Sequence, residues 1–358
     1  MRSTLRVFVF ATTFALARGS IVSAQQPQVS NGQVSSQTVD HGLQSALDAL
    51  KQSATPLWAG YMIPTASPFN GGNSGSQVTY LEPHHTPDES PNGKSTTGPD
   101  DARQDQATQG QAIVLFRLAS GKIGEVRAAP VDRPIDAGGL RFVWLTNVTP
   151  EDSVATLKTL ALASDSNRLF DSAVFLISIH QSQVAVPALI AIAAPGGNPH
   201  LREQAAFWLA KQGGREGFVA IQNLARTDKD DKFRAKLTFD LTLSKDPGAL
   251  DEIVRMAHED SSPQVRSQAQ FWVASRGGKI VTASLRDSAD NDPDASIRKK
   301  AVFAISRLPN GDATTQLVEL AQTSKYPEVR KQAVFWLGQS NDPKALDYLT
   351  KLITSVNR

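Results

Sequence analysis

The chain has 358 residues, of which 40% are hydrophobic and 20% are charged, and it contains no cysteine. This composition is that of a soluble globular protein of about two domains, and it excludes disulfide bonds, cysteine nucleophiles and thiolate metal sites. Residues 1–24 carry three of the 37 bases and no acid, so the remainder has 34 bases against 35 acids, and neither nucleic acid nor an anionic membrane is an expected partner.

The first 24 residues have the pattern of a secretory signal peptide. Arg2 and Arg6 precede an apolar run over residues 7–16, and small residues lead up to Ala24. The run is too short to cross about 30 Å of hydrocarbon, which argues against a membrane anchor. We therefore expect cleavage after Ala24, a secreted or periplasmic protein, and no membrane span in what remains.

A small, mainly β module is predicted over residues 41–147. The preceding residues, 25–40, are rich in Gln, Ser and Val, which favours disorder. Residues 41–53 have the apolar spacing of a short helix, and residues 65–109 have the composition of a long flexible loop. Four apolar stretches predict strands, the middle two joined as a hairpin: 57–63, 112–118, 123–128 and 140–145.

A repeat of 32 residues occupies the rest of the chain, residues 149–358. One position, which we call the phenylalanine column, is the same in all six repeats: Phe175, Phe207, Phe239, Phe271, Phe303 and Phe335. Two further apolar columns, beginning at Leu169 and Leu189, keep step with it, and short polar residues such as Asn198 and Asp230 stand where helices would begin.

The repeat predicts a helix, a short turn and a second helix in each unit. Neither helix can bury its apolar side alone, so about six pairs should stack into a right-handed superhelical α-solenoid behind the small β-rich module, α+β overall. We expect the phenylalanine column to be the buried spine of this stack. Truncating one of its members to alanine would then cost about 3–5 kcal/mol of stability.

Two segments, residues 260–272 and 327–338, carry the pattern D…PxVRxxAxFWL, and residues 342–349 continue it as DPxALxxL. Over roughly residues 150–358 the sequence resembles the HEAT-like repeats first named for phycobilisome lyases, in their short bacterial variety. Residues 136–145 also resemble a module that precedes such arrays in secreted bacterial proteins. The resemblance implies the solenoid fold, but not one activity, because these repeats occur in lyases, hydroxylases and plain scaffolds.

An arginine follows the column that begins at Leu169 in five repeats: Arg202, Arg234, Arg266, Arg298 and Arg330. Such a ladder could bind a polyanion. The favoured interpretation is structural, because Asp228, Asp260 and Asp292 each lie six residues before one of these arginines, where bidentate pairs would tie neighbouring repeats together.

Tryptophan follows the phenylalanine column in alternate repeats, as Trp208, Trp272 and Trp336, while Asp240 and Ala304 stand between them. Such tryptophans usually belong to the core. Partly exposed, they would instead form a groove of binding hot spots for an apolar segment of a protein partner.

Candidate catalytic and metal-binding groups are sparse. HEAT-like hydroxylases hold two irons with His-Glu pairs in several repeats, whereas this chain has the one pair His258-Glu259. The dipeptide His84-His85 lies in the predicted loop, and neither a G-x-S-x-G motif nor a phosphate-binding loop is present. We expect no catalytic residue, metal or cofactor.

The function predicted from the sequence is therefore that of a non-catalytic protein–protein interaction scaffold in the bacterial cell envelope or outside the cell. One alternative is an enzyme, or an enzyme subunit, with a lyase-like or hydroxylase-like site between the β module and the solenoid. The other is polyanion binding through the arginine ladder.

Overall fold

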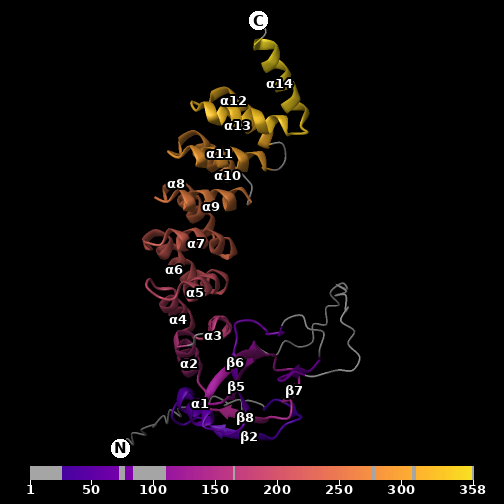
Figure 1. Cartoon of the computed structure of the whole chain (residues 1–358), viewed down its shortest axis with the longest axis vertical. Coiled ribbons are helices and arrows are strands. Elements are labelled where there is room, and N and C mark those ends of the chain that lie inside the picture. Colours follow the sequence, from indigo (N-terminus) through magenta and orange to yellow (C-terminus); the bar gives the residue numbers. More distant parts are fainter. Residues whose placement is uncertain are drawn as a thin grey trace, which may run out of the picture.

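The computed structural model describes residues 26–71, 77–83, 110–163, 166–275, 279–308 and 312–356. Strands occupy the N-terminal end of the molecule, and the helices rise from them as a stack to the C-terminus (Figure 1). The predicted signal peptide, its cleavage site and His84-His85 lie outside the described residues.

A five-stranded sheet is the centre of the N-terminal module. Its order is β2 (Val34–Thr38), β8 (Arg141–Thr146), β3 (Leu57–Pro64), β5 (Gln111–Ala119) and β6 (Lys122–Ala129). Strands β5 and β6 form the predicted hairpin. Ser120 and Gly121 connect them with φ angles of 52° and 75°, the positive values that a two-residue hairpin turn requires.

The predicted disorder of residues 25–40 is wrong for the described part of that segment. It contains β1 (Val29–Ser30) and β2, which pairs in parallel with β8. A second, three-stranded sheet joins β1, β7 (Ile135–Asp136) and β4 (Thr79–Tyr80), and β4 lies within the predicted loop. Strands β1 and β2 pair with strands about a hundred residues later in the chain. The local composition of residues 25–40 carries no information about such distant partners.

Both faces of the five-stranded sheet are buried. Tyr61 and Phe116 pack with α1 (Leu43–Lys51) and with the helices at the N-terminal end of the stack in one continuous apolar core. On the opposite face, Trp58, Phe142 and Trp144 pack with residues of the three-stranded sheet. The module is thus joined to the solenoid through a shared core, and it covers the end of the stack.

The solenoid begins with α2 (Pro150–Ala163), after which the described helices form six pairs. In chain order these are α3 (Asn167–Ile179) and α4 (Ala185–Ala193), α5 (Pro199–Gln212) and α6 (Gly214–Thr227), α7 (Asp231–Leu243) and α8 (Ala249–Glu259), α9 (Pro263–Ala274) and α10 (Lys279–Asn291), α11 (Ala295–Ser306) and α12 (Asp312–Thr323), and α13 (Pro327–Gly338) and α14 (Pro343–Val356). The predicted solenoid of about six pairs is confirmed.

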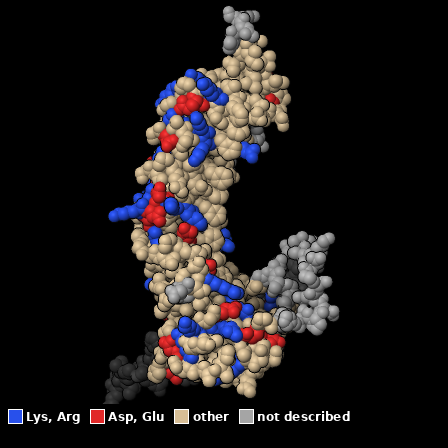
Figure 2. All heavy atoms as spheres, in the orientation of Figure 1, with Lys and Arg blue, Asp and Glu red and all other residues tan. Residues whose placement is uncertain are grey.

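The stack is bowed, and its two helix layers differ in spacing. The first helices of successive pairs contact one another closely, whereas the second helices touch less. The first helices therefore form the inner, concave layer of the arc. In the view of Figure 2, charged side chains gather in clusters along the opposite, convex side.

Apart from Leu169 and Leu349 at the ends of the array, two of the three repeated apolar columns are buried, but the phenylalanine column is not. Phe271, Phe303 and Phe335 are 55%, 41% and 54% exposed, and the other three members are half-buried. The expectation of a buried spine is therefore wrong. Ala269 and Val273, two residues to either side of Phe271, are the buried positions, and two residues are about 200° around a helix.

Among the described residues, no helix combines the length and the apolar character that a membrane span would need.

Candidate binding surface

The most distinctive surface of the solenoid is a ladder of aromatic rings on the first helices, which we call the aromatic face. It consists of the phenylalanine column and the three tryptophans that follow it in alternate repeats. Each tryptophan is half-buried. The tryptophans therefore belong neither to the core nor to the open surface, and the sequence alone does not distinguish these cases.

Each tryptophan lies between the phenylalanines of two successive repeats. The ring of Trp272 is 5.1 Å from Phe239 in the preceding repeat and 4.9 Å from Phe271 in its own, the second contact being edge-on. Trp208 and Trp336 repeat this arrangement with their own neighbours. At the N-terminal end, Phe69 from the β module lies 6.2 Å from Phe175, so the ladder starts at the module.

The first gap without a tryptophan is filled by an ion pair. Asp240 stands at the tryptophan position, and the Lys236 ammonium lies 2.7 Å from its carboxylate and 5.0 Å from the Phe239 ring. Asp240 is fully buried, and burial raises its pKa to about 6 despite the nearby lysine.

The second gap without a tryptophan is open. Ala304 stands at the tryptophan position, and a cavity of about 630 Å³ lies between Phe271 and Phe303. The exposed side chains of Lys300 and Arg307 also line it. The aromatic face therefore has a hollow at the repeat boundary between α9 and α11.

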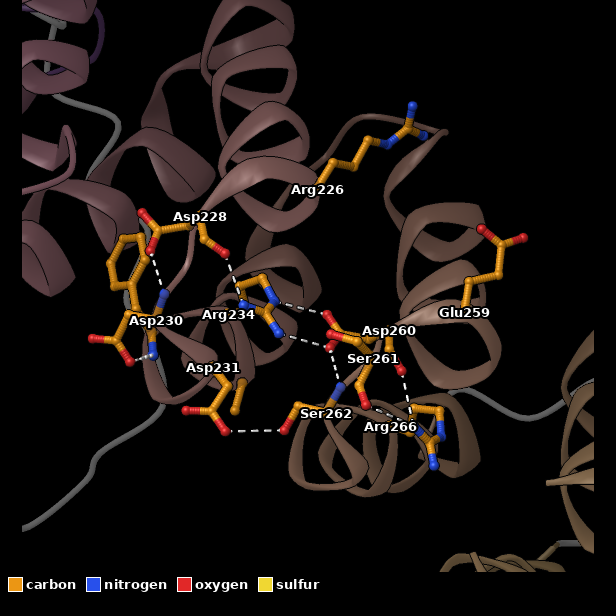
Figure 3. Close-up of polar contacts among 12 residues, drawn as sticks. Arg226, Asp228, Asp230, Asp231, Arg234, Glu259, Asp260, Ser261, Ser262 and Arg266 are labelled. Atoms are coloured by element: carbon orange, nitrogen blue, oxygen red, sulfur yellow. Dashed lines mark hydrogen bonds and ion pairs between the residues drawn. The ribbon is translucent and has the colours of Figure 1, made fainter. Parts of the chain in front are cut away.

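The arginine column serves the structure and does not face solvent. Arg202, Arg234, Arg266 and Arg298 are only 5–8% exposed. Arg266 donates from Nε and Nη2 to the Asp292 carboxylate, at 2.7 and 3.1 Å, and from Nη1 to the Asp260 carbonyl, at 2.8 Å. The same bonds join Arg234 to Asp260 and to the Asp228 carbonyl (Figure 3).

The aspartate that was predicted to bind each arginine through its carboxylate lies one repeat too early in the chain. The aspartate six residues before an arginine contributes its backbone carbonyl, while the carboxylate comes from the aspartate 26 residues later. Each carboxylate also accepts from its own turn, as Asp260 does from the Ser262 amide at 2.8 Å, and this orients it toward the preceding repeat. In the last pairs Arg298 binds Glu328 instead, and the half-buried Arg330 donates to the Ser324 carbonyl.

Polyanion binding through the arginine ladder is inconsistent with this geometry. Four of the five guanidinium groups are buried, and each of the four bonds a carboxylate. Releasing Arg202, Arg234 or Arg266 to a ligand would leave a buried aspartate without its counter-charge.

The junction of module and solenoid holds a buried hydrogen-bonded chain of Tyr61, Ser153 and His180. The Tyr61 and Ser153 hydroxyls lie 2.7 Å apart, Ser153 is 2.7 Å from His180 Nε2, and Nδ1 is 2.6 Å from the Leu176 carbonyl. Because that carbonyl can only accept, Nδ1 carries the proton, Nε2 accepts from Ser153, and Ser153 accepts from Tyr61. The three side chains are at most 5% exposed. The hydrogen-bonded chain therefore joins the module to the solenoid and is not accessible to a substrate.

The remaining histidines of interest have protein partners. His258 contacts Ser284 at 2.7 Å and Asp287 at 3.1 Å on α10, and Glu259 points elsewhere, toward Arg255 at 3.7 Å. His200 lies 2.6 Å from Asp171. Within the described ranges, no three His, Cys, Asp or Glu side chains come together as a metal site would require.

A second hollow, of about 730 Å³, lies on the other side of the stack between α10 and α12. Its lining is polar, and Arg286 crosses it to bind Asp290 and Glu319, each at 2.7 Å. The cation in this lining is thus already paired with carboxylates of the chain, in contrast to the cations at the gap on the aromatic face.

Comparisons with known proteins identify the repeat. The family described as HEAT repeats matches residues 282–358. No curated protein matches the sequence. Among solved structures, human deoxyhypusine hydroxylase in complex with glycerol is 19% identical, with 55% of this chain and 77% of that chain covered at a TM-score of 0.25.

Two further solved structures are similar to parts of this chain. The complex of CpcE and CpcF of phycocyanin lyase from Nostoc sp. PCC7120 is 23% identical, covering 44% of this chain and 100% of that chain at a TM-score of 0.32. Kap121p is 12% identical, covering 57% of this chain and 27% of that chain at a TM-score of 0.36. These similarities assign no activity to this chain.

Proposed function

The helical part of this chain is an array of HEAT-like repeats, and we propose that it is a non-catalytic scaffold that binds a protein partner on its aromatic face. The observation that carries the proposal is the exposure of Phe271, Phe303 and Phe335 on consecutive first helices. The array buries most of its other repeated apolar positions, so three large rings left in solvent on one face need a different explanation.

Exposed rings in a row have the properties of binding anchors. Aromatic side chains lose little conformational entropy when they are covered and dominate the energetics of protein interfaces. Here the ring contacts with Trp272 and Trp336 hold the phenylalanines in place before any partner arrives. Lys211 lies 5.6 Å from the Phe207 ring, and Arg307 lies 5.8 Å from the Phe303 ring, so cations border the apolar surface.

We also propose that the protein acts in the cell envelope or outside the cell. The support is the signal-like pattern of residues 1–24 described above. Mass spectrometry of the protein produced from its full gene would test this: a mature N-terminus at Gln25 is expected, and an intact N-terminus in the cytoplasmic fraction would contradict it.

The binding proposal is tested by co-purification from periplasmic and secreted fractions. The variant Phe271→Ser, Phe303→Ser, Phe335→Ser removes the exposed rings, and Val219→Ser is the control, because Val219 is 47% exposed on the second helix α6. We expect the triple variant to lose the proteins that the wild type and the control retain, with circular dichroism unchanged. Equal retention by all three proteins would contradict the proposal.

A further inference from the structure

We propose that the cavity between Phe271 and Phe303 receives a tryptophan side chain from an acidic segment of the partner. This inference rests on the proposed function and assigns one pocket of the aromatic face and the chemistry of its occupant. Two features of the cavity point to this occupant: its shape and its charge.

The shape argument comes from the other rungs of the ladder. At three repeat boundaries an indole lies between two phenylalanines, at ring distances of 4.9–5.1 Å. The boundary between Phe271 and Phe303 has the same two rings, but Ala304 takes the place of the tryptophan. The chain itself thus shows which side chain fits between two such rings.

The charge argument comes from the other gap without a tryptophan. There Lys236 bonds the carboxylate of Asp240, four residues later. Lys300 holds the equivalent position in the open gap, 64 residues on, and the residue four positions later is Ala304.

Lys300 consequently lacks the internal carboxylate that its counterpart has. It forms no ion pair with any residue that the structure describes, and neither does Arg307. The cavity lining contains these two cations and no acid. A carboxylate of the partner, next to the inserted ring, would do for Lys300 what Asp240 does for Lys236.

A synthetic peptide is a direct probe of the cavity. We suggest N-acetyl-Gly-Asp-Trp-Asp-Gly-amide, titrated into the full protein and followed by isothermal calorimetry. Replacing its tryptophan by alanine should weaken binding by about tenfold or more, since a buried aromatic ring is lost. Replacing both aspartates by asparagine should weaken it several-fold and remove most of its salt dependence.

The matched protein variants copy other rungs of the same ladder. Ala304→Trp fills the gap from within, as Trp272 and Trp336 do, and should abolish peptide binding without lowering the melting temperature. Lys300→Gln copies Gln268 and Gln332, the residues at that position beside tryptophans, and should remove the preference for aspartate.

Peptide binding that persists in Ala304→Trp, or no saturable binding at all, would overturn the assignment. Equal affinity for free N-acetyl-tryptophan would also overturn it, because the occupant would then be a small aromatic acid and not a partner segment. These results are independent of the co-purification experiment: a partner lost in the triple phenylalanine variant but retained by Ala304→Trp would leave the proposed function standing without this pocket.

Discussion

Trp272 lies against Phe239 of the preceding repeat, with ring centroids 5.1 Å apart, and both rings belong to a ladder that runs along the first helices. The contact crosses a repeat boundary, so it contributes to the stacking of the solenoid. It also covers only part of each ring, which leaves an aromatic edge in solvent at every rung. Stability and a binding surface therefore come from the same residues.

The tryptophans should matter more for stability than the phenylalanines beside them. Trp272 is half-buried and touches two rings, whereas Phe271 is 55% exposed. We expect Trp272→Ala to cost about 2–3 kcal/mol and Phe271→Ala about 1 kcal/mol, because less apolar area returns to water in the second case. Urea unfolding measures both, and a loss of about 3–5 kcal/mol for Phe271→Ala would restore the buried spine that the sequence suggested.

Removing one arginine of the column should strongly lower the stability of the folded protein. Arg266→Ala leaves the Asp292 carboxylate buried without its bidentate partner, for which we expect a loss of about 3–5 kcal/mol in urea unfolding. The double variant Arg266→Met, Asp292→Leu removes both charges and should recover most of that loss. Lys351→Ala breaks the exposed pair with Asp347 and should change nothing measurable. A mild effect of Arg266→Ala would show that the column is dispensable to the stack.

The junction between module and solenoid should weaken in acid. Burial lowers the pKa of His180 below its ordinary value of 6.5, so the folded protein keeps the imidazole neutral while the unfolded chain takes up a proton. The contribution of His180 is complete above about pH 6.5 and declines as the pH falls below that value. Denaturation midpoints between pH 7.5 and 4.5 should fall more steeply for the wild type than for His180→Gln, and parallel curves would refute this.

Asp240 should show the opposite dependence. Its folded pKa of about 6 lies above its ordinary value of 3.8, so its contribution to stability is complete below about pH 3.8 and is lost as the pH rises through 6. Asp240→Asn lacks this titration. Relative to that variant, the wild type should lose up to about 3 kcal/mol of stability between pH 4 and pH 7. A difference between the two proteins that does not change with pH would contradict the burial of a proton at this site.

The repeated part of the fold could be predicted from the sequence, because a period of 32 residues with helix caps fixes the helix pairs and their stacking. The period did not show which column is buried. Residues at equal spacing have similar surroundings in every repeat, but those surroundings can be either the core or the solvent. Leu201, Ala205 and Leu209, spaced four residues apart, mark the buried side of α5 and place Phe207 away from it. That spacing was the signal that could have corrected the assignment.

Other features could not be predicted from local sequence patterns. Strand β2 has few apolar residues and owes its order to backbone bonds with β8, more than a hundred residues later. The hollow at Ala304 could not be predicted, because the sequence does not show that each tryptophan packs between the phenylalanines of two repeats. Asp228, Asp260 and Asp292 were correctly expected to bind arginines of the column. The direction in which each carboxylate points depends on the turn that holds it, as at Asp260.

Site-specific photo-crosslinking is a direct test of whether the protein binds a partner on its aromatic face. Benzoylphenylalanine would replace Phe303 on the first helix α11 in one protein and Val219 on the second helix α6 in another, and both would be irradiated in the compartment where the protein resides. We expect a discrete crosslinked partner at Phe303 and none at Val219. The same partner at Val219, with none at Phe303, would show that the protein binds through its other side.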